Sequence, residues 1–295
     1  MTVPHDVVAM VESRLQTRID GTQDLGGGCI AHATRLDTAR GPLFLKWSRR
    51  SAAAAFPAEA EGLRALREAS GEACNERLHI PEALLTVGAV PPEPGILILE
   101  WVEPGVPDAS FWEAFGTGLA ELHRVTGAGY GFRRDNFIGR LPQWNTWYAS
   151  WPDFFGAMRI EPQVRMARDG GRWDDRWTAP LERLMRALDE LLPARPEASI
   201  LHGDLWSGNF LVAQEDRAAL IDPAVYYGHR ETDLAMTELF GGFDDRFYSA
   251  YRNAWPLEAG YELRRQVYNL YHLINHLNHE GAAYARSVDR ILTAF

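Results

Sequence analysis

The spacing of apolar and polar residues divides the chain into a strand-rich beginning and a long helical remainder. Residues 4–15 carry three valines and a leucine on one side, which predicts a short amphipathic helix. Apolar stretches at residues 43–47, 83–87 and 96–102 predict strands. From Asp108 onward apolar residues recur every three or four positions, which indicates helices. The pattern therefore predicts a small sheet followed by a larger helical part.

The helical part begins with a predicted capping box, in which Ser110 and Glu113 satisfy the first turn of a helix. His123, near the end of this helix, is predicted to be a packed, hydrogen-bonded structural residue. A second structural role is predicted for Asp233, as a helix cap or as a brace for a neighbouring loop. Further helices are predicted at about residues 151–168, 175–192, 244–255 and 261–279, with a short one at the end. Another is predicted to start at Thr232 or Glu231 and to run to Phe240. Residues 130–147 are irregular and rich in glycine and aromatic residues, which is typical of a functional segment.

Lys46 lies inside the apolar strand at residues 43–47, where a buried ammonium group requires an anion. The alanine-rich segment 52–69 predicts a helix that can supply one. Glu59 is in register with apolar residues three and four positions away, so it shares their face. We therefore predict a pair between Lys46 and Glu59. Glu61 lies off this stripe and is expected in solvent.

Three apolar runs between residues 199 and 223 enclose a set of oxygen-bearing side chains. Asp204 follows the first run, Asn209 comes five residues later, and Asp222 ends the third run. A β-hairpin formed by the second and third runs brings these residues together. Two acids and an amide oxygen are ligands that suit Mg²⁺. A His-Gly-Asp tripeptide is common in loops, and an aspartate at the end of a strand is often only a cap. The joint spacing of Asp204, Asn209 and Asp222 nevertheless favours a metal site.

Composition and charge narrow the choice of partners and compartment. The 295 residues are enough for two lobes, and 46% are hydrophobic. Acidic residues outnumber basic ones 40 to 30, giving a net charge of −10, so neither nucleic acid nor an anionic membrane is an expected partner. Two cysteines cannot build a disulfide framework or a four-cysteine zinc site. Without a recognisable signal peptide or membrane span, a cytoplasmic location is expected.

A glycine-rich turn precedes the first long alternating stretch. The backbone N–H groups of Gly26, Gly27 and Gly28 can approach phosphates closely, although a plain hairpin turn has the same composition. Cys29 follows among N–H groups that favour a thiolate. We predict an accessible thiol whose oxidation inhibits the protein, through a disulfide between two Cys29 residues. A buried packing cysteine is the alternative.

The catalytic segment resembles that of known kinases. His202-Gly-Asp204, then Asn209, then Asp222-Pro223 after a hairpin, resembles the protein-kinase catalytic loop and metal-binding segment. The longer match His202-Gly-Asp-Leu-Trp-Ser-Gly-Asn209 is similar to the catalytic loop of the fructosamine kinases, also called ketosamine-3-kinases. Further matches are at residues 26–30, 135–139, 222–224, 227–229, 240–243, 247–251 and 277–279. Ala31 and His32 depart from the family pattern, but they touch no catalytic role.

This resemblance, which covers residues 5 to 290, implies a bilobal protein-kinase-like fold of the α+β class. A nucleotide-binding lobe at residues 1–102 has a small antiparallel sheet and one main helix, and a mostly helical catalytic and substrate-binding lobe follows at residues 103–295. ATP and Mg²⁺ are the implied cofactors. The glycine turn and Lys46 would contact the phosphates. The hinge backbone at Glu100, Trp101 and Val102 would meet adenine.

The implied reaction is ATP-dependent phosphorylation of a sugar hydroxyl on a fructosamine or ribulosamine, free or attached to a protein. Asp204 would deprotonate the hydroxyl, while Asn209 and Asp222 would hold Mg²⁺. The predicted substrate residues are Asp135, Asn136, Trp206 and His229. Trp144, Trp147 and Trp151, with the amides of Gln143 and Asn145, are also expected to face a sugar, unless the tryptophans build the helical core.

Two other functions are compatible with the same motifs. One is a kinase of the aminoglycoside or choline type, but such enzymes place acidic residues around a cationic substrate, whereas residues 130–147 are mainly aromatic and amide. The other is a nucleotide-binding protein without turnover, which the complete set Lys46, Asp204, Asn209 and Asp222 disfavours. A monomer and a homodimer are equally compatible with the sequence.

Overall fold

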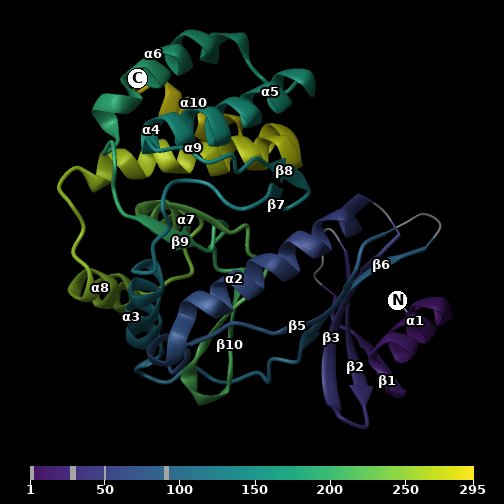
Figure 1. The fold of residues 1–295 in the computed structure, drawn as a ribbon. Coiled ribbons are helices and arrows are strands. Elements are labelled where there is room, and N and C mark those ends of the chain that lie inside the picture. The colour runs from purple at the N-terminus through teal and green to yellow at the C-terminus, as the bar shows by residue number, and fades with distance from the viewer. Residues whose placement is uncertain (1–2, 27–30, 50, 90–92) are drawn as a thin grey trace.

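The computed structural model describes residues 3–26, 31–49, 51–89 and 93–295, which form two lobes (Figure 1). In Figure 1 the N-terminal sheet lies at the lower right, and the helical lobe occupies the left and top. The long helix α2 (Phe56–Asn75) runs between them. This arrangement confirms the predicted small sheet and larger helical lobe.

The N-terminal sheet is antiparallel throughout. Its strand order is β1 (Ile19–Asp24), β2 (His32–Thr38), β3 (Gly41–Ser48), β6 (Gly95–Glu100) and β5 (Ala83–Val87). Alternate residues of a strand face opposite sides. Leu45 and Trp47 of β3 accordingly pack with Val7 and Val11 of α1 (His5–Leu15), whereas Lys46 points to the other side, toward α2.

Helix α2 follows the short 3₁₀ turn η1 (Ser51–Ala55) and extends six residues beyond the predicted end, with a non-helical Gly71 inside it. Leu63 and Leu66 are completely buried on its apolar face. The two-residue strand β4 (Leu78–His79) comes next and was not predicted. It pairs in parallel with β11 (Ala218–Leu220) of the C-terminal lobe. This pairing joins a strand before Val102 to a strand after it. The predicted boundary between the lobes at residues 102 and 103 stays a prediction.

The first helix of the C-terminal lobe, α3 (Phe111–His123), buries its predicted apolar face. The predicted capping box is wrong, because the Ser110 side chain makes no capping bond to the helix. Asp108 Oδ1 instead accepts hydrogen bonds from the backbone N–H groups of Ser110 and Phe111, at 2.6 and 3.1 Å. An aspartate two residues earlier therefore caps the turn, which the sequence pattern did not distinguish.

The long helix α9 (Tyr261–Glu280) lies in the upper part of the helical lobe with α4 (Trp151–Phe154), α5 (Glu161–Asp169) and α10 (Ala285–Leu292) near it, whereas α8 (Asp245–Ala254) lies beside α3 (Figure 1). The remaining helical elements are the π-helical η2 (Phe155–Ile160), η3 (Asp175–Trp177), α6 (Thr178–Leu191), α7 (Glu231–Leu239) and η5 (Gly281–Tyr284). The strands are β7 (Asn136–Ile138), β8 (Leu141–Gln143), β9 (Ala198–Leu201), β10 (Phe210–Val212) and β12 (Tyr226–His229), and η4 (Gln214–Asp216) joins β10 to β11. No helix in the described part of the chain is both long and apolar enough to cross a bilayer.

Candidate active site

The predicted catalytic hairpin forms between the two lobes. Strands β10 and β11 pair antiparallel, while β9 pairs with β12. The loop after β9 carries Asp204, and Asp222 follows β11. The backbone N–H of Ile221 donates to the Asn209 carbonyl at 3.0 Å, so the segment leading to Asp222 lies beside Asn209. The hairpin thus brings together residues that are far apart in the sequence.

Asp233 of α7 holds the backbone of the catalytic loop. Its carboxylate accepts hydrogen bonds from the backbone N–H groups of His202 and Gly203, at 2.7 and 2.9 Å, and lies 3.2 Å from Nε2 of His123. Burial alone would raise the pKa of Asp233, but the bonds from His123 and Gly203 lower it below its ordinary value. The predicted structural roles of His123 and Asp233 are confirmed, and Asp233 acts as the loop brace.

Gly203 is required by the close approach of two backbone segments. Its φ is +84°, and an added Cβ would lie 2.1 Å from the carbonyl oxygen of Ala224. A side chain at this position would separate the loop from the segment that follows Asp222. This contact and the positive φ both favour glycine at this position.

Replacing Asp233 with alanine is expected to lower the free energy of unfolding by about 2–4 kcal/mol, because it leaves buried N–H donors without an acceptor. Because the pKa of Asp233 is lowered, its contribution is complete at neutral pH and is lost as the pH falls below about 4. Denaturant unfolding at pH 7 measures the loss. The matched control is Asp189→Ala, an exposed aspartate on α6, which should change stability by less than about 0.5 kcal/mol. Equal stabilities would contradict the bracing role.

Asp204 lies in surroundings that change the pKa of its carboxyl group. It is partly buried, and its carboxylate Oδ2 accepts a hydrogen bond from Nδ2 of Asn209 at 3.1 Å. Burial raises the pKa of Asp204 to about 7, while the bond from Asn209 acts in the opposite direction. A carboxylate whose pKa lies near neutral pH is suited to general-base work.

Asn209 and Asp222 have the donor chemistry of a magnesium site. The Nδ2 of Asn209 is directed to Asp204, and among the described residues no donor is bonded to its Oδ1. Asp222 has φ +54°, a strained conformation for a non-glycine residue, and its side chain is 45% exposed. These residues fit Mg²⁺.

The predicted pair between Lys46 and Glu59 is present. Lys46 Nζ lies 2.7 Å from Glu59 Oε1, and Lys46 also pairs with the carboxylate of Asp222. Burial would lower the pKa of Lys46, but the carboxylates of Asp222 and Glu59 together raise it. Burial likewise raises the pKa of Glu59, which Lys46 counteracts. One ammonium group therefore joins β3, α2 and the catalytic hairpin.

The predicted nucleotide loop is described only at its beginning. Gly26 has φ +64°, and its N–H donates to Oδ1 of Asp24 at 3.2 Å. Gly27, Gly28 and Cys29 lie outside the described residues, so the phosphate and redox predictions for them stay predictions. At the hinge, the N–H of Glu100 donates to Glu82 within the sheet.

The hinge contains two residues, Trp101 and Val102, whose N–H groups bond to no other backbone group in the described part of the chain. Trp101 donates through Nε1 to Glu103 at 2.9 Å, and the guanidinium of Arg35 lies 4.8 Å from its ring centroid. The side chain of Trp101 thus braces the hinge from one side.

The amides predicted to bind a sugar are instead buried in a network. Asn136 Nδ2 donates to the Val225 carbonyl at 2.8 Å, and Asn136 Oδ1 accepts from both Gln143 and Asn145. Asn145 Oδ1 in turn accepts from the buried Arg159 at 2.7 Å. The expectation that these amides bond substrate hydroxyls is wrong, because their groups are used inside the protein.

Other predicted substrate residues divide between the core and the surface. His229 is buried, with Nδ1 2.7 Å from the Tyr268 hydroxyl, which indicates a structural role. Trp151 is fully buried, which confirms the alternative prediction that it packs in the core of the helical lobe. Asp135 is exposed and accepts from the N–H of Asn145, and Trp147 is 49% exposed. Substrate contact by Asp135 stays a prediction, and Asn136 and His229 find no support in this geometry.

The predicted substrate residue Trp206, two residues after Asp204, begins an aromatic row that was not predicted from the sequence and that continues through Phe240, His276 and Tyr284. Trp206 and Phe240 are 36% and 38% exposed, and their ring centroids are 6.3 Å apart. Phe240 lies edge-on to His276 at 4.9 Å, and His276 stacks on Tyr284 at 4.8 Å. Gly242, in the Phe-Gly-Gly-Phe segment, permits this approach, because an added Cβ would lie 2.6 Å from Ser207. That motif was the available signal.

Glu61 is not in solvent as expected. Its side chain is 7% exposed and forms ion pairs with both Arg133 and Arg134 of the C-terminal lobe. The helical pattern could not reveal this burial, since the partners lie about seventy residues further along the chain.

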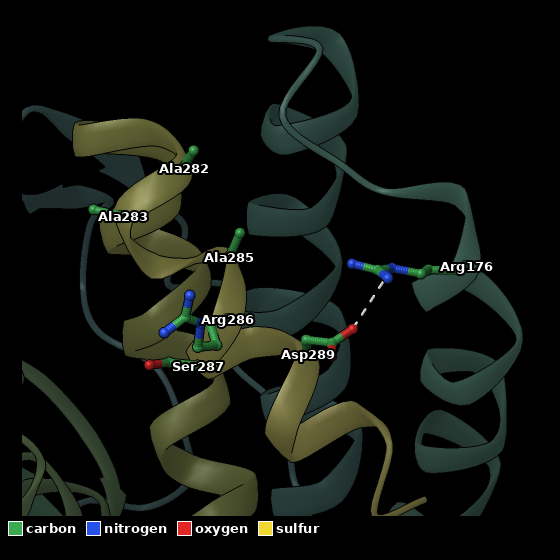
Figure 2. A pocket seen from close by; sticks show the side chains of 7 residues that line it. All are labelled: Arg176, Ala282, Ala283, Ala285, Arg286, Ser287 and Asp289. Carbon is green, nitrogen blue, oxygen red and sulfur yellow. Dashed lines mark ion pairs between the residues drawn. The ribbon is translucent and has the colours of Figure 1, made fainter.

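A surface hollow elsewhere contains none of the predicted catalytic residues. Figure 2 shows it between η3 and the C-terminal helical elements, lined by alanines together with Arg176, Arg286, Ser287 and Asp289. Arg176 Nε lies 3.7 Å from the Asp289 carboxylate. The hollow plays no part in the site between the lobes.

Comparison with known proteins supports the same assignment along the whole chain. Residues 5–295 match the family model described as fructosamine kinase. A protein of Enterococcus faecium assigned as a ketoamine kinase is 36% identical over 270 residues, covering 91% of this chain and 93% of that protein. The chloroplastic protein-ribulosamine 3-kinase of Arabidopsis thaliana is 36% identical over 282 residues, covering 94% and 82%.

Solved structures agree on the fold. A crystal structure from Thermobifida fusca, assigned as a fructosamine-3-kinase, superposes with a TM-score of 0.86 at 33% identity, and 99% of each chain is covered. The aminoglycoside phosphotransferase APH(4)-Ia has a TM-score of 0.63 at 17% identity, covering 97% of this chain and 98% of that chain. The second similarity concerns the fold alone.

Proposed function

Because the chain belongs to the fructosamine kinase family, we propose that it transfers the γ-phosphoryl group of ATP to a sugar hydroxyl of a fructosamine or ribulosamine. The observation that carries this proposal is the meeting of Lys46 and Glu59 with Asp222, next to Asp204 and Asn209. Phosphoryl transfer requires mainly alignment and charge neutralisation, and these groups supply both.

In the proposed reaction, Asp204 accepts the proton of the sugar hydroxyl as its oxygen bonds to the γ-phosphorus. The bond from that phosphorus to the bridging oxygen breaks, and ADP leaves. Lys46, oriented by Glu59, neutralises charge on the α- and β-phosphates. Asn209 and Asp222 would hold Mg²⁺, which neutralises phosphate charge when bound.

We place the nucleotide between the lobes, with the glycine turn and the hinge at Val102 on its two sides, and the acceptor against the aromatic row. The flat exposed ring of Trp206 suits the C–H face of a sugar and lies two residues from Asp204. A ketosamine attached to a protein fits this exposed surface as well as a free one, so a deglycation role is part of the proposal. A cytoplasmic location is also proposed, supported by the low cysteine content.

Substrate preference tests this proposal. With equal ATP and Mg²⁺, at least one of a ribulosamine and a fructosamine should exceed choline and kanamycin in kcat/KM by roughly a hundredfold, about 3 kcal/mol of differential transition-state binding. The aromatic row offers the flat ring faces that suit a sugar. A lead for kanamycin or choline would transfer the assignment to another small-molecule kinase.

A further inference from the structure

The ion pairs of Glu61 connect the two lobes at a place that bears on the active site. Glu61 and Glu59 are two residues apart on α2, so their side chains point about 200° apart around the helix. Glu59 faces Lys46, while Glu61 faces Arg133 and Arg134. The arginine side chains are 50% and 58% exposed, whereas Glu61 is buried between them.

The adjacent residue brings α2 against the segment that follows Asp222. A Cβ added to Gly62 would lie 3.2 Å from Val225 and 3.4 Å from Pro223. The helix backbone therefore rests directly on the residues that follow the proposed metal ligand. Any rotation or withdrawal of α2 would open this contact and separate Glu59 from Lys46.

The segment that carries the two arginines also holds the residues after Asp222. Asn136, two residues beyond Arg134, donates to the Val225 carbonyl at 2.8 Å. The two carboxylates that meet Lys46, one on α2 and one at Asp222, are thus both positioned by the segment 133–136. Burying the Glu61 carboxylate costs free energy unless its ion pairs with Arg133 and Arg134 are both formed. The two pairs therefore favour one position of α2 relative to the segment 133–136.

We propose that Glu61, with Arg133 and Arg134, is an interlobe latch that positions α2 so that Glu59 orients Lys46 for ATP. Glu61 is a positioning residue, because it acts through Glu59 and does not touch the nucleotide. The inference rests on the proposed function only in taking ATP as the ligand of Lys46.

The test measures Mg·ATP affinity by calorimetry with no acceptor present, so it does not depend on which substrate is phosphorylated. Glu61→Gln should weaken Mg·ATP binding by about tenfold, within the range of coupling between sites. Glu68→Gln, an exposed glutamate on the same helix, should bind like the wild type. If the wild-type protein bound Mg·ATP normally but did not phosphorylate any ketosamine, that result would count against the proposed function and leave the latch intact.

A double-mutant cycle separates the latch from general stabilisation. If Glu61 acts through Glu59, the double variant Glu59→Gln, Glu61→Gln should bind Mg·ATP no more weakly than Glu59→Gln alone. The surface variants Arg133→Ala and Arg134→Ala should each show part of the effect and together match Glu61→Gln, so the test survives if Glu61→Gln fails to fold. A lower Tm with wild-type Mg·ATP affinity, or additive losses in the cycle, would overturn the latch.

Discussion

The Asp204→Asn variant is expected to lower kcat by roughly two to four powers of ten, the range for a general acid–base residue. Asparagine keeps the size of the side chain but cannot accept the hydroxyl proton. Its amide can still lie beside Asn209, which now contacts the Asp204 carboxylate at 3.1 Å. Steady-state kinetics with a ketosamine measure kcat, and calorimetry measures ATP affinity.

ATP affinity is the internal control for this variant. It should change little, because Asp204 lies on the acceptor side and makes no contact with Lys46 or Glu59 among the interactions described. Turnover close to that of the wild type would remove Asp204 from the mechanism. A large loss of ATP binding would instead indicate that the substitution disturbs the loop held by Asp233.

The second large effect is expected at Asp222. Replacing it with alanine should weaken Mg²⁺-dependent ATP binding on the order of a hundredfold, about 3 kcal/mol, and more than Asn209→Ala does. A charged oxygen ligand is lost in the first case and a neutral one in the second. The side chain is 45% exposed, so its removal leaves no large cavity.

Titration of Mg²⁺ against both variants at fixed ATP checks this order. Binding of ATP without Mg²⁺ is the control, and it should not fall in Asp222→Ala, because Lys46 keeps Glu59 as a partner and loses a carboxylate that competes with phosphate. If Asn209→Ala proved the more damaging variant, the roles of the two ligands would have to be exchanged.

Local spacing was sufficient to predict the Lys46–Glu59 pair and the hairpin that carries the acidic residues. Glu59 falls on the apolar face of α2 by helical periodicity, and Lys46 falls on the inner face of β3 by strand alternation. The apolar runs around Asp204, Asn209 and Asp222 specify a hairpin whose geometry follows from short-range pairing. These features depend on residues close together in the chain, so a single sequence contains the information.

The predicted substrate residues show where this reasoning stops. Asn136, His229 and Trp151 have side chains that suit a sugar, yet each is buried and bonded to a residue from a distant part of the chain. Composition tells which bonds a side chain can make but does not identify its partner. The partner depends on how α9 and the segment after Asp222 pack against residues 130–151.

By itself, the sequence determined a small sheet followed by a larger helical part, the Lys46–Glu59 pair and the acidic set of the hairpin, because periodicity and short loops encode them. Only the tertiary structure decided that Glu61 is buried between two arginines and that Trp206 continues into an aromatic row. Glu61 and its partners are about seventy residues apart, and the row joins residues from 206 to 284. Burial at such separations is set by the packing of whole elements, which no local pattern of the chain records.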